Sequence, residues 1–116
     1  MDKPEWYSAK LRFAVMVETK GADLLYDCVF LFRAADFDMA FERAIKIGET
    51  QETEYRNGDA KRVNWKFSEI ISLDVILAAD LDGAEICADP VFLSKEETIP
   101  FETKFDPRLS KPTQTI

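Results

Sequence analysis

The sequence predicts a single α+β domain in which one amphipathic helix covers one face of an antiparallel sheet of four to five strands. Three observations predict this class: an early run of alternating apolar residues, a helical stripe that follows it, and a return to strand patterns afterwards. The expected order along the chain is β-β-α-β-β-β, followed by an extended C-terminal arm. We expect residues 1–93 to form the domain and residues 94–116 to form a Pro-punctuated arm or tail.

Length and composition agree with one globular domain. The chain has 116 residues, of which 47% are hydrophobic and 32% are charged. A chain of this length buries roughly two-thirds of its unfolded surface, so it can form a hydrophobic core. No secretion signal opens the sequence, and its longest uncharged apolar runs are far too short to span a bilayer. We therefore expect a cytoplasmic protein.

The first two strands are predicted from consecutive patterns. Apolar residues at every second position indicate a half-buried strand over about Ala9–Thr19. Turn chemistry at Gly21 precedes a second run, Leu24–Arg33, which is rich in residues that favour strands. This run is apolar at both parities, with Cys28, Phe30 and Phe32 on one face and Val29 and Leu31 on the other. We expect both faces of the second strand to be covered.

A helix is the most clearly marked element. Apolar and small residues recur at helical spacing, and Asp36 stands where an N-cap is needed. The stripe consists of Phe37, Ala40, Phe41, Ala44, Ile45 and Gly48. Gly48 lowers helix propensity by about 1 kcal/mol, so we expect it to permit close packing of the helix on the sheet.

The remaining strands follow the helix. A short strand is expected over Glu52–Arg56, with a hairpin turn at Asn57-Gly58. The partner strand starts near Val63 and continues to about Leu73, with a bulge near Ser68, and a last short strand is expected at residues 84–88. Beyond residue 93, three prolines and isolated apolar residues indicate either an extended arm on this or a neighbouring chain, or a disordered tail.

Several kinds of chemistry are disfavoured by composition. The chain has no histidine, which is the commonest general base and metal ligand, and its two cysteines lie in apolar runs typical of buried thiols. The Asp80-x-Asp82-Gly83-x-Glu85 segment lacks the longer ligand series of a calcium loop. We expect no metal, no cofactor and no catalytic residues. A net charge of −7 argues against nucleic acid and anionic membranes as partners.

A resemblance rests on four motifs in order along the chain, which are Trp6-Tyr7-Ser8-Ala9-Lys10-Leu11, Ala44-Ile45-Lys46-Ile47-Gly48, Tyr55-Arg56-Asn57-Gly58 and Val63-Asn64-Trp65-Lys66-Phe67. Together they resemble a family of small bacterial proteins known as domain-of-unknown-function family four-two-eight-eight, over about Trp6–Ala88. The resemblance implies a bacterial cytoplasmic α+β domain and supplies no activity. It also carries an association with immunity proteins of bacterial toxin systems.

Two functional hypotheses remain at this point. The first is a non-enzymatic interaction protein, specifically an acidic inhibitor of a basic bacterial toxin, that forms a homodimer because one helix cannot cover both sheet faces. The second is a small-ligand module or weak enzyme with a pocket of aromatic and lysine residues. The candidate ligand or partner surface in either case comprises Trp6, Tyr7, Lys10, Tyr55, Trp65 and Lys66. Packing of these amphipathic aromatics in the core and at its rim is the structural alternative.

Overall fold

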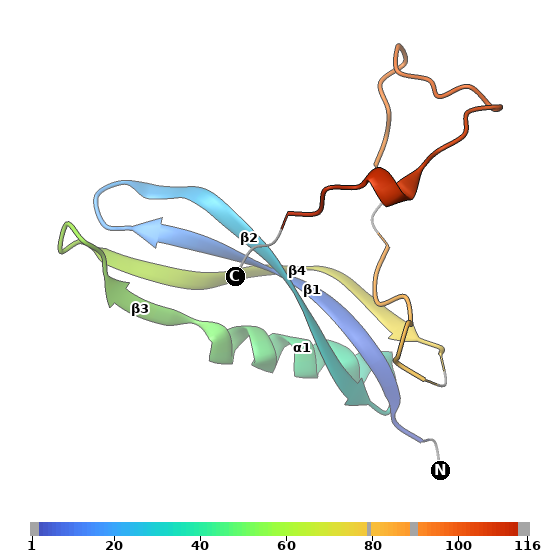
Figure 1. Cartoon of the computed structure of the whole chain (residues 1–116). Coiled ribbons are helices and arrows are strands. Elements are labelled where there is room, and N and C mark those ends of the chain that lie inside the picture. The colour runs from blue at the N-terminus through green and yellow to red at the C-terminus, as the bar shows by residue number, and fades with distance from the viewer. Residues whose placement is uncertain (1–2, 79, 89–90, 114–116) are drawn as a thin grey trace.

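The computed structural model describes residues 3–78, 80–88 and 91–113. Within these residues, four strands form one antiparallel sheet in the order β2-β1-β4-β3, and a single α-helix lies along one face of it (Figure 1). The elements are β1 (Glu5–Val17), β2 (Gly21–Ala34), α1 (Phe37–Gln51), β3 (Thr53–Arg56) and β4 (Arg62–Ile76). The predicted α+β class is confirmed. We call the sheet face that α1 covers the helix face and the opposite side the second face.

β1 and β2 form a long hairpin. β1 begins four residues before the predicted start at Ala9, and its turn comes just before the predicted one, with Thr19 and Gly21 at φ 72 and 80. Such left-handed conformations suit a tight reversal. β1 is central in the sheet and pairs with both β2 and β4. Its alternate side chains from Tyr7 to Val15 are buried on the helix face, where they form the middle of the core.

α1 begins and packs as its sequence predicts. The Asp36 carboxylate accepts a hydrogen bond from the Met39 backbone N–H at 2.8 Å, which confirms it as the N-cap. Ala40, Ala44 and Gly48 are the buried residues of the helix. A Cβ atom on Gly48 would lie 2.5 Å from the ring of Phe67, so the predicted close approach to the sheet is confirmed.

The apolar stripe is only partly buried. Phe37 and Phe41, which the pattern assigned to the stripe, are both about half exposed. They flank the line of small residues and do not face the sheet directly, because the helix contacts the sheet through Ala40, Ala44 and Gly48. The closeness that these small residues permit leaves the large flanking side chains at the rim.

The β3–β4 hairpin is confirmed together with its irregularity. Asn57 accepts hydrogen bonds through its side chain from the backbone N–H groups of Asp59 and Lys61, at 2.9 and 3.1 Å, which closes the turn. In the β1–β4 ladder, Phe13 pairs with Phe67 and Arg12 pairs with Glu69, so Ser68 is the extra residue of a bulge. A second register shift nearby makes Ile71 extra as well.

The segment at residues 84–88 is not a strand in the structure. It lies over the second face instead, since the Ser8 hydroxyl donates a hydrogen bond to the Ile86 carbonyl. Ser8 belongs to the central strand, and its side chain and that of Ile76 are almost fully buried. A segment that crosses the face of a sheet cannot join a ladder at the edge, which explains the difference from the predicted strand.

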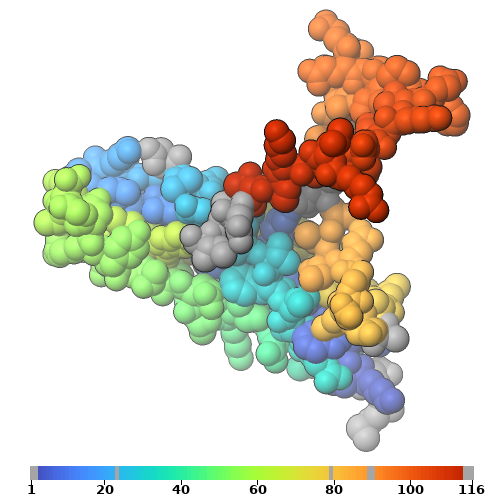
Figure 2. Space-filling model, in the orientation of Figure 1, coloured from blue at the N-terminus to red at the C-terminus, as the bar shows by residue number. Residues whose placement is uncertain are grey.

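Residues 91–113, which we call the arm, form a loop that leaves the sheet and then runs back toward it (Figure 1). Their one regular element is a short 3-10 helix at Pro107–Leu109. In the space-filling view the orange part of the arm projects from the body, whereas the red part returns toward it (Figure 2). The radius of gyration, 18.7 Å, is accordingly well above the roughly 13 Å typical of a compact chain of about 100 residues. Residues 114–116 of the predicted tail lie outside the described residues.

Candidate interaction surface

The six residues predicted to form one ligand or partner surface lie on opposite faces of the sheet. The pairing register puts Tyr7, Tyr55 and Trp65 on the helix face. The same register puts the other three on the second face, and these are Trp6, Lys10 and Lys66. A sheet of paired strands separates the two groups, so the six side chains cannot line a single pocket. This corrects the predicted aromatic and lysine pocket.

On the helix face the aromatic residues pack mainly on one another. The ring of Tyr7 stacks on Phe32, with 6.2 Å between centroids, and is buried. Trp65 stacks on Tyr26 at 4.8 Å and an interplanar angle of 15°. Tyr55, on the short β3, remains half exposed. Offset stacking of this kind stabilises the fold by about 0.5–1.5 kcal/mol per pair.

The middle of the second face is charged. Arg12 of β1 donates to both carboxylate oxygens of Asp27 on β2, at 2.8 and 3.0 Å, and lies 3.6 Å from Glu69 on β4. These hydrogen bonds hold the pKa of Asp27 below its ordinary value and raise that of Arg12. A three-strand ion cluster can remain in contact with water, so this part of the second face needs no apolar cover.

The other three candidates lie around this cluster, and the charge of Lys10 contributes to lowering the pKa of Asp27. The guanidinium of Arg33 lies over the Trp6 ring, 5.6 Å from its centroid, at the end of the hairpin where β1 starts. Lys10 and Lys66 lie farther along the sheet, opposite Ser72 and Ala14 in the β1–β4 ladder. Whether any of these side chains binds a ligand stays a prediction.

The outer edge of β2 carries apolar side chains on both faces, which we call the β2 edge surface. Its members are between 41% and 52% exposed, and they are Leu24, Leu25, Tyr26, Val29 and Leu31. β2 is the outermost strand on its side of the sheet. The doubly apolar pattern of residues 24–33 predicted that β2 requires cover on both faces, and the described part of the chain does not supply it. The strand order cannot be read from the sequence pattern, and it places all of these apolar side chains at one edge of the sheet.

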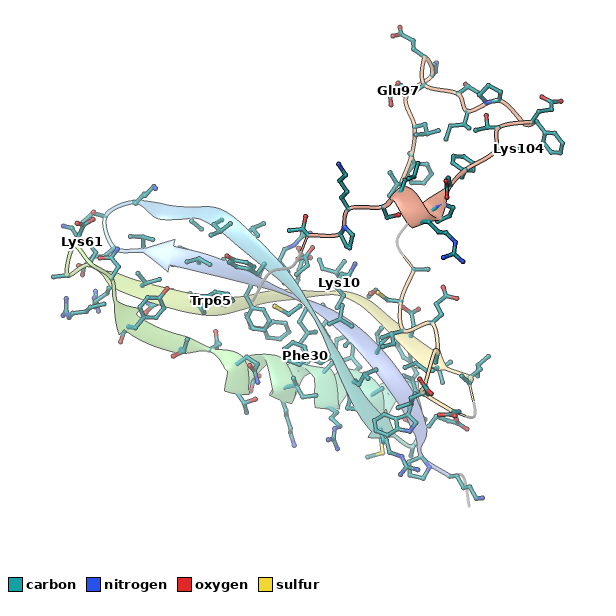
Figure 3. All side chains as sticks on the ribbon, in the orientation of Figure 1. Lys10, Phe30, Lys61, Trp65, Glu97 and Lys104 are labelled. Atoms are coloured by element: carbon teal, nitrogen blue, oxygen red, sulfur yellow. The ribbon has the colours of Figure 1, made fainter. Side chains whose placement is uncertain are left out.

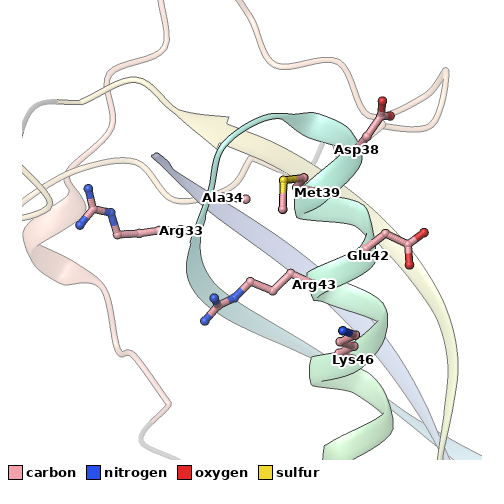
Figure 4. Close-up of a pocket in the computed structure, with 7 residues that line it drawn as sticks. All are labelled: Arg33, Ala34, Asp38, Met39, Glu42, Arg43 and Lys46. Carbon is pink, nitrogen blue, oxygen red and sulfur yellow. The ribbon is translucent and has the colours of Figure 1, made fainter. Parts of the chain in front are cut away.

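A shallow hollow of about 480 Å³ lies between the end of β2 and one flank of α1 (Figure 4). Its walls are mainly apolar, and its rim carries both signs of charge. The lining residues are Arg33, Ala34, Asp38, Met39, Glu42, Arg43 and Lys46. Arg43 extends across it, with its guanidinium 5.8 Å from the centroid of the Phe32 ring. None of the six predicted surface residues lines this hollow.

The arm exposes large apolar side chains that the sequence located only as isolated positions. Phe92 and Phe101 are 88% and 98% exposed, and Phe105 and Leu109 are also largely exposed. Figure 3 shows side chains around Glu97 and Lys104 projecting outward from the loop. The arm's apolar residues therefore contribute little to the packing of the domain.

The two cysteines and the acidic turn show no assembled chemistry in the described part of the chain. Cys28 is partly buried, and burial together with the charge of Asp27 raises the pKa of its thiol. Asp80 accepts from the backbone N–H of Asp82 at 3.0 Å, which is the geometry of an ordinary Asx turn. Among the described residues, no three carboxylates or thiols converge as metal ligands would.

Among the described residues, no helix has the length and apolar character needed to cross a bilayer.

Compared with known proteins, the chain matches the family model described as a domain of unknown function, DUF4288, over residues 6–88. This range runs from Trp6, near the start of β1, to the end of the segment that lies over the second face, and it stops short of the arm. No curated protein and no solved structure matches.

Proposed function

Because the chain belongs to the DUF4288 family, whose function is unknown, we propose its role from the surfaces that the fold leaves open. The protein is a non-catalytic interaction protein that binds a macromolecular partner through its arm. The observation that carries this proposal is the exposure of Phe92, Phe101 and Phe105, at 88%, 98% and 70%, on a segment outside the sheet and helix. Apolar groups gathered on one exposed segment are typical of an interaction site.

The distribution of charge supports a basic partner. Beyond residue 90, four acidic residues are balanced by four basic residues, so the whole net charge of −7 belongs to the preceding part of the chain. A neutral, apolar arm beside an acidic domain suits a partner with an apolar groove flanked by basic residues. An inhibitor of a basic bacterial toxin in the bacterial cytoplasm is the specific form of this proposal.

The chemistry of Cys28 favours a binding role over catalysis. A nucleophilic cysteine requires a lowered pKa and a partner base, whereas the pKa of Cys28 is raised and the sequence contains no histidine. The division of the aromatic and lysine residues between two faces also removes the pocket on which the small-ligand hypothesis depended.

The experiment is affinity capture from a lysate of the organism that carries the gene, at physiological salt. The test variant replaces Phe92, Phe101 and Phe105 with serine. The matched control replaces three exposed polar residues of the same arm, Glu97, Glu102 and Lys104, with serine. We expect one protein to be retained by the unmodified chain and by the control, and to be lost from the test variant.

If the protein inhibits a basic toxin, we expect two further results. The retained protein should be basic, and its binding should weaken as salt is raised, because charge attraction between exposed groups is screened. Co-expression of the two proteins should also relieve the toxicity of the partner. Capture of no protein at physiological salt, or equal capture by the test variant, contradicts the proposed function.

A further inference from the structure

β2 is an unusually open edge strand. It spans 14 residues, and its outer side pairs with no other strand of the described chain. Natural edge strands are generally protected by proline, by lysine or by inward-pointing charges. Between Leu24 and Phe32, β2 has no proline and no lysine, and its one charged residue, Asp27, is engaged by Arg12 on the neighbouring strand. This edge is therefore suited to pairing with another strand.

We propose that a second copy of the chain occupies this edge. Two β2 strands pair antiparallel around a two-fold axis that passes beside Cys28, and the two sheets join into one continuous sheet. The proposed interface is separate from the arm, so it stands independently of the function proposed above. It deepens the expectation of a homodimer by naming the strand, the direction and the register.

Symmetry limits the possible registers. A two-fold axis between antiparallel strands is perpendicular to the sheet, so both copies have the helix face on the same side. The axis must then pass beside a residue that lies directly opposite the same residue of the second copy. With Cys28 at the axis, Leu25 opposes Leu31 of the second copy. On the helix face, Tyr26 opposes Phe30 in the same way. Leu24 likewise opposes Phe32, so four of the half-exposed apolar side chains meet apolar partners, whereas Val29 opposes Asp27.

The neighbouring registers are less favourable. An axis at Asp27 would place two carboxylates directly opposite each other, which is destabilising. An axis at Val29 would place Leu25 opposite Arg33 and would leave Asp27 opposite Leu31. Only the register centred on Cys28 pairs Leu25 with Leu31, and in it the two Asp27 side chains are diagonal neighbours rather than directly opposed.

The rest of the fold leaves room for this arrangement. α1 packs chiefly against β4, which is two strands away from the proposed junction. α1 also contacts the end of β2, where Arg43 lies over Phe32 beside the hollow (Figure 4), and this contact is four residues from Cys28 along the strand. The two helices would therefore lie on the same face of the joined sheet without meeting at the axis.

The register is tested by cross-linking through Cys28 in the full chain. Opposed Cα atoms of antiparallel strands are about 4.5–5.5 Å apart, within the roughly 4.4–6.8 Å range of disulfides. A Cys87→Ser variant keeps Cys28 as its single cysteine. Copper-catalysed oxidation of this variant at low protein concentration should give a covalent dimer, and a Cys28→Ser/Cys87→Ser variant should give none. Absence of the covalent dimer overturns the register.

A pair of charge variants tests the interface without any cross-link. Leu25→Lys/Leu31→Lys places lysine opposite lysine twice in the proposed register, whereas Leu25→Lys/Leu31→Glu places lysine opposite glutamate. Both side chains are half exposed, so the single chain should tolerate either variant, which far-UV circular dichroism and thermal unfolding will verify. Analytical ultracentrifugation should show the unmodified protein and the lysine–glutamate variant as dimers, and the lysine–lysine variant as a monomer.

The other outcomes overturn the proposal. A monomer at every concentration for the unmodified protein would show that the edge is not a self-pairing site. A dimer that persists in the lysine–lysine variant would show that association uses another surface, such as the arm. Equal dimerisation of both charge variants would show that Leu25 and Leu31 do not oppose each other.

Discussion

The two strands of the first hairpin contrast in an unexpected way. β1 alternates apolar and polar residues and is the central strand, whereas β2 is apolar on both faces and is outermost. Leu11 of β1 is fully buried, but Leu25 of β2 is 52% exposed. Burial in this sheet is therefore decided by position in the strand order rather than by the hydrophobicity of the strand. An apolar strand at the edge is the arrangement expected of a domain that associates.

The sharpest test of this contrast replaces one leucine in each strand. Leu11→Ala should lower the free energy of unfolding by about 2–5 kcal/mol, because it removes buried methyl groups and leaves a cavity. Leu25→Ala should change the stability of the single chain by no more than about 0.5 kcal/mol. Urea unfolding at two protein concentrations separates folding from association. Equal losses at the lower concentration would contradict the difference between the strands.

A smaller effect is expected where α1 touches β4. Gly48→Ala improves helix propensity by about 1 kcal/mol, but its Cβ would collide with the ring of Phe67. We expect a net destabilisation of about 1–3 kcal/mol, as is typical of overpacking. Phe67→Leu in the same chain should relieve part of that loss, which a double-mutant cycle measures. An increase in stability from Gly48→Ala alone would show that the ring moves away freely.

The helix start provides a test that involves neither strand of the hairpin. Asp36→Ala should cost about 1 kcal/mol, because the Met39 N–H loses its acceptor. Asp36→Asn keeps an acceptor oxygen at the same place and serves as the matched control, with a loss well below that of alanine. Equal losses in both variants, measured by urea unfolding, would indicate that the cap hydrogen bond is unimportant.

The smallest expected effect concerns the ion pair that joins β1 to β2. Hydrogen bonds from Arg12 depress the pKa of Asp27, so their stabilisation is present above the ordinary carboxyl pKa of roughly 4 and is lost as the pH falls through the depressed value. Asp27→Asn should therefore be less stable than the unmodified chain at pH 7, with the gap narrowing at pH 3. The gap should also shrink in high salt. A gap that widens in acid would contradict this assignment.

Local features of the fold were predicted well because neighbouring residues determine them. The Asp36 cap, the close approach at Gly48 and the bulge at Ser68 each depend on a short stretch of sequence, and the structure confirms all three. The segment at residues 84–88 was predicted wrongly as a strand. Its position depends on a contact with Ser8, which is remote in sequence.

The six candidate residues divide between the two faces of the sheet for a reason that the strand pattern already contained. Trp6 and Tyr7 are consecutive residues of one strand, as are Trp65 and Lys66, and consecutive strand residues point to opposite faces. Grouping them by chemical type ignored this alternation. The exposed edge of β2 was beyond prediction for a different reason, since strand order depends on the long-range pairing of β1 with β4.

The hydrogen bond from Ser8 to Ile86 has a consequence for the order of folding. Its two residues are separated by 78 positions in the sequence. Closing so long a loop costs entropy that is repaid only after β1 has paired with β4 and the chain has been brought back across the sheet. We therefore expect this contact to form last during folding and to open first, so that the amide protons of residues 84–88 exchange with solvent well before those of β1.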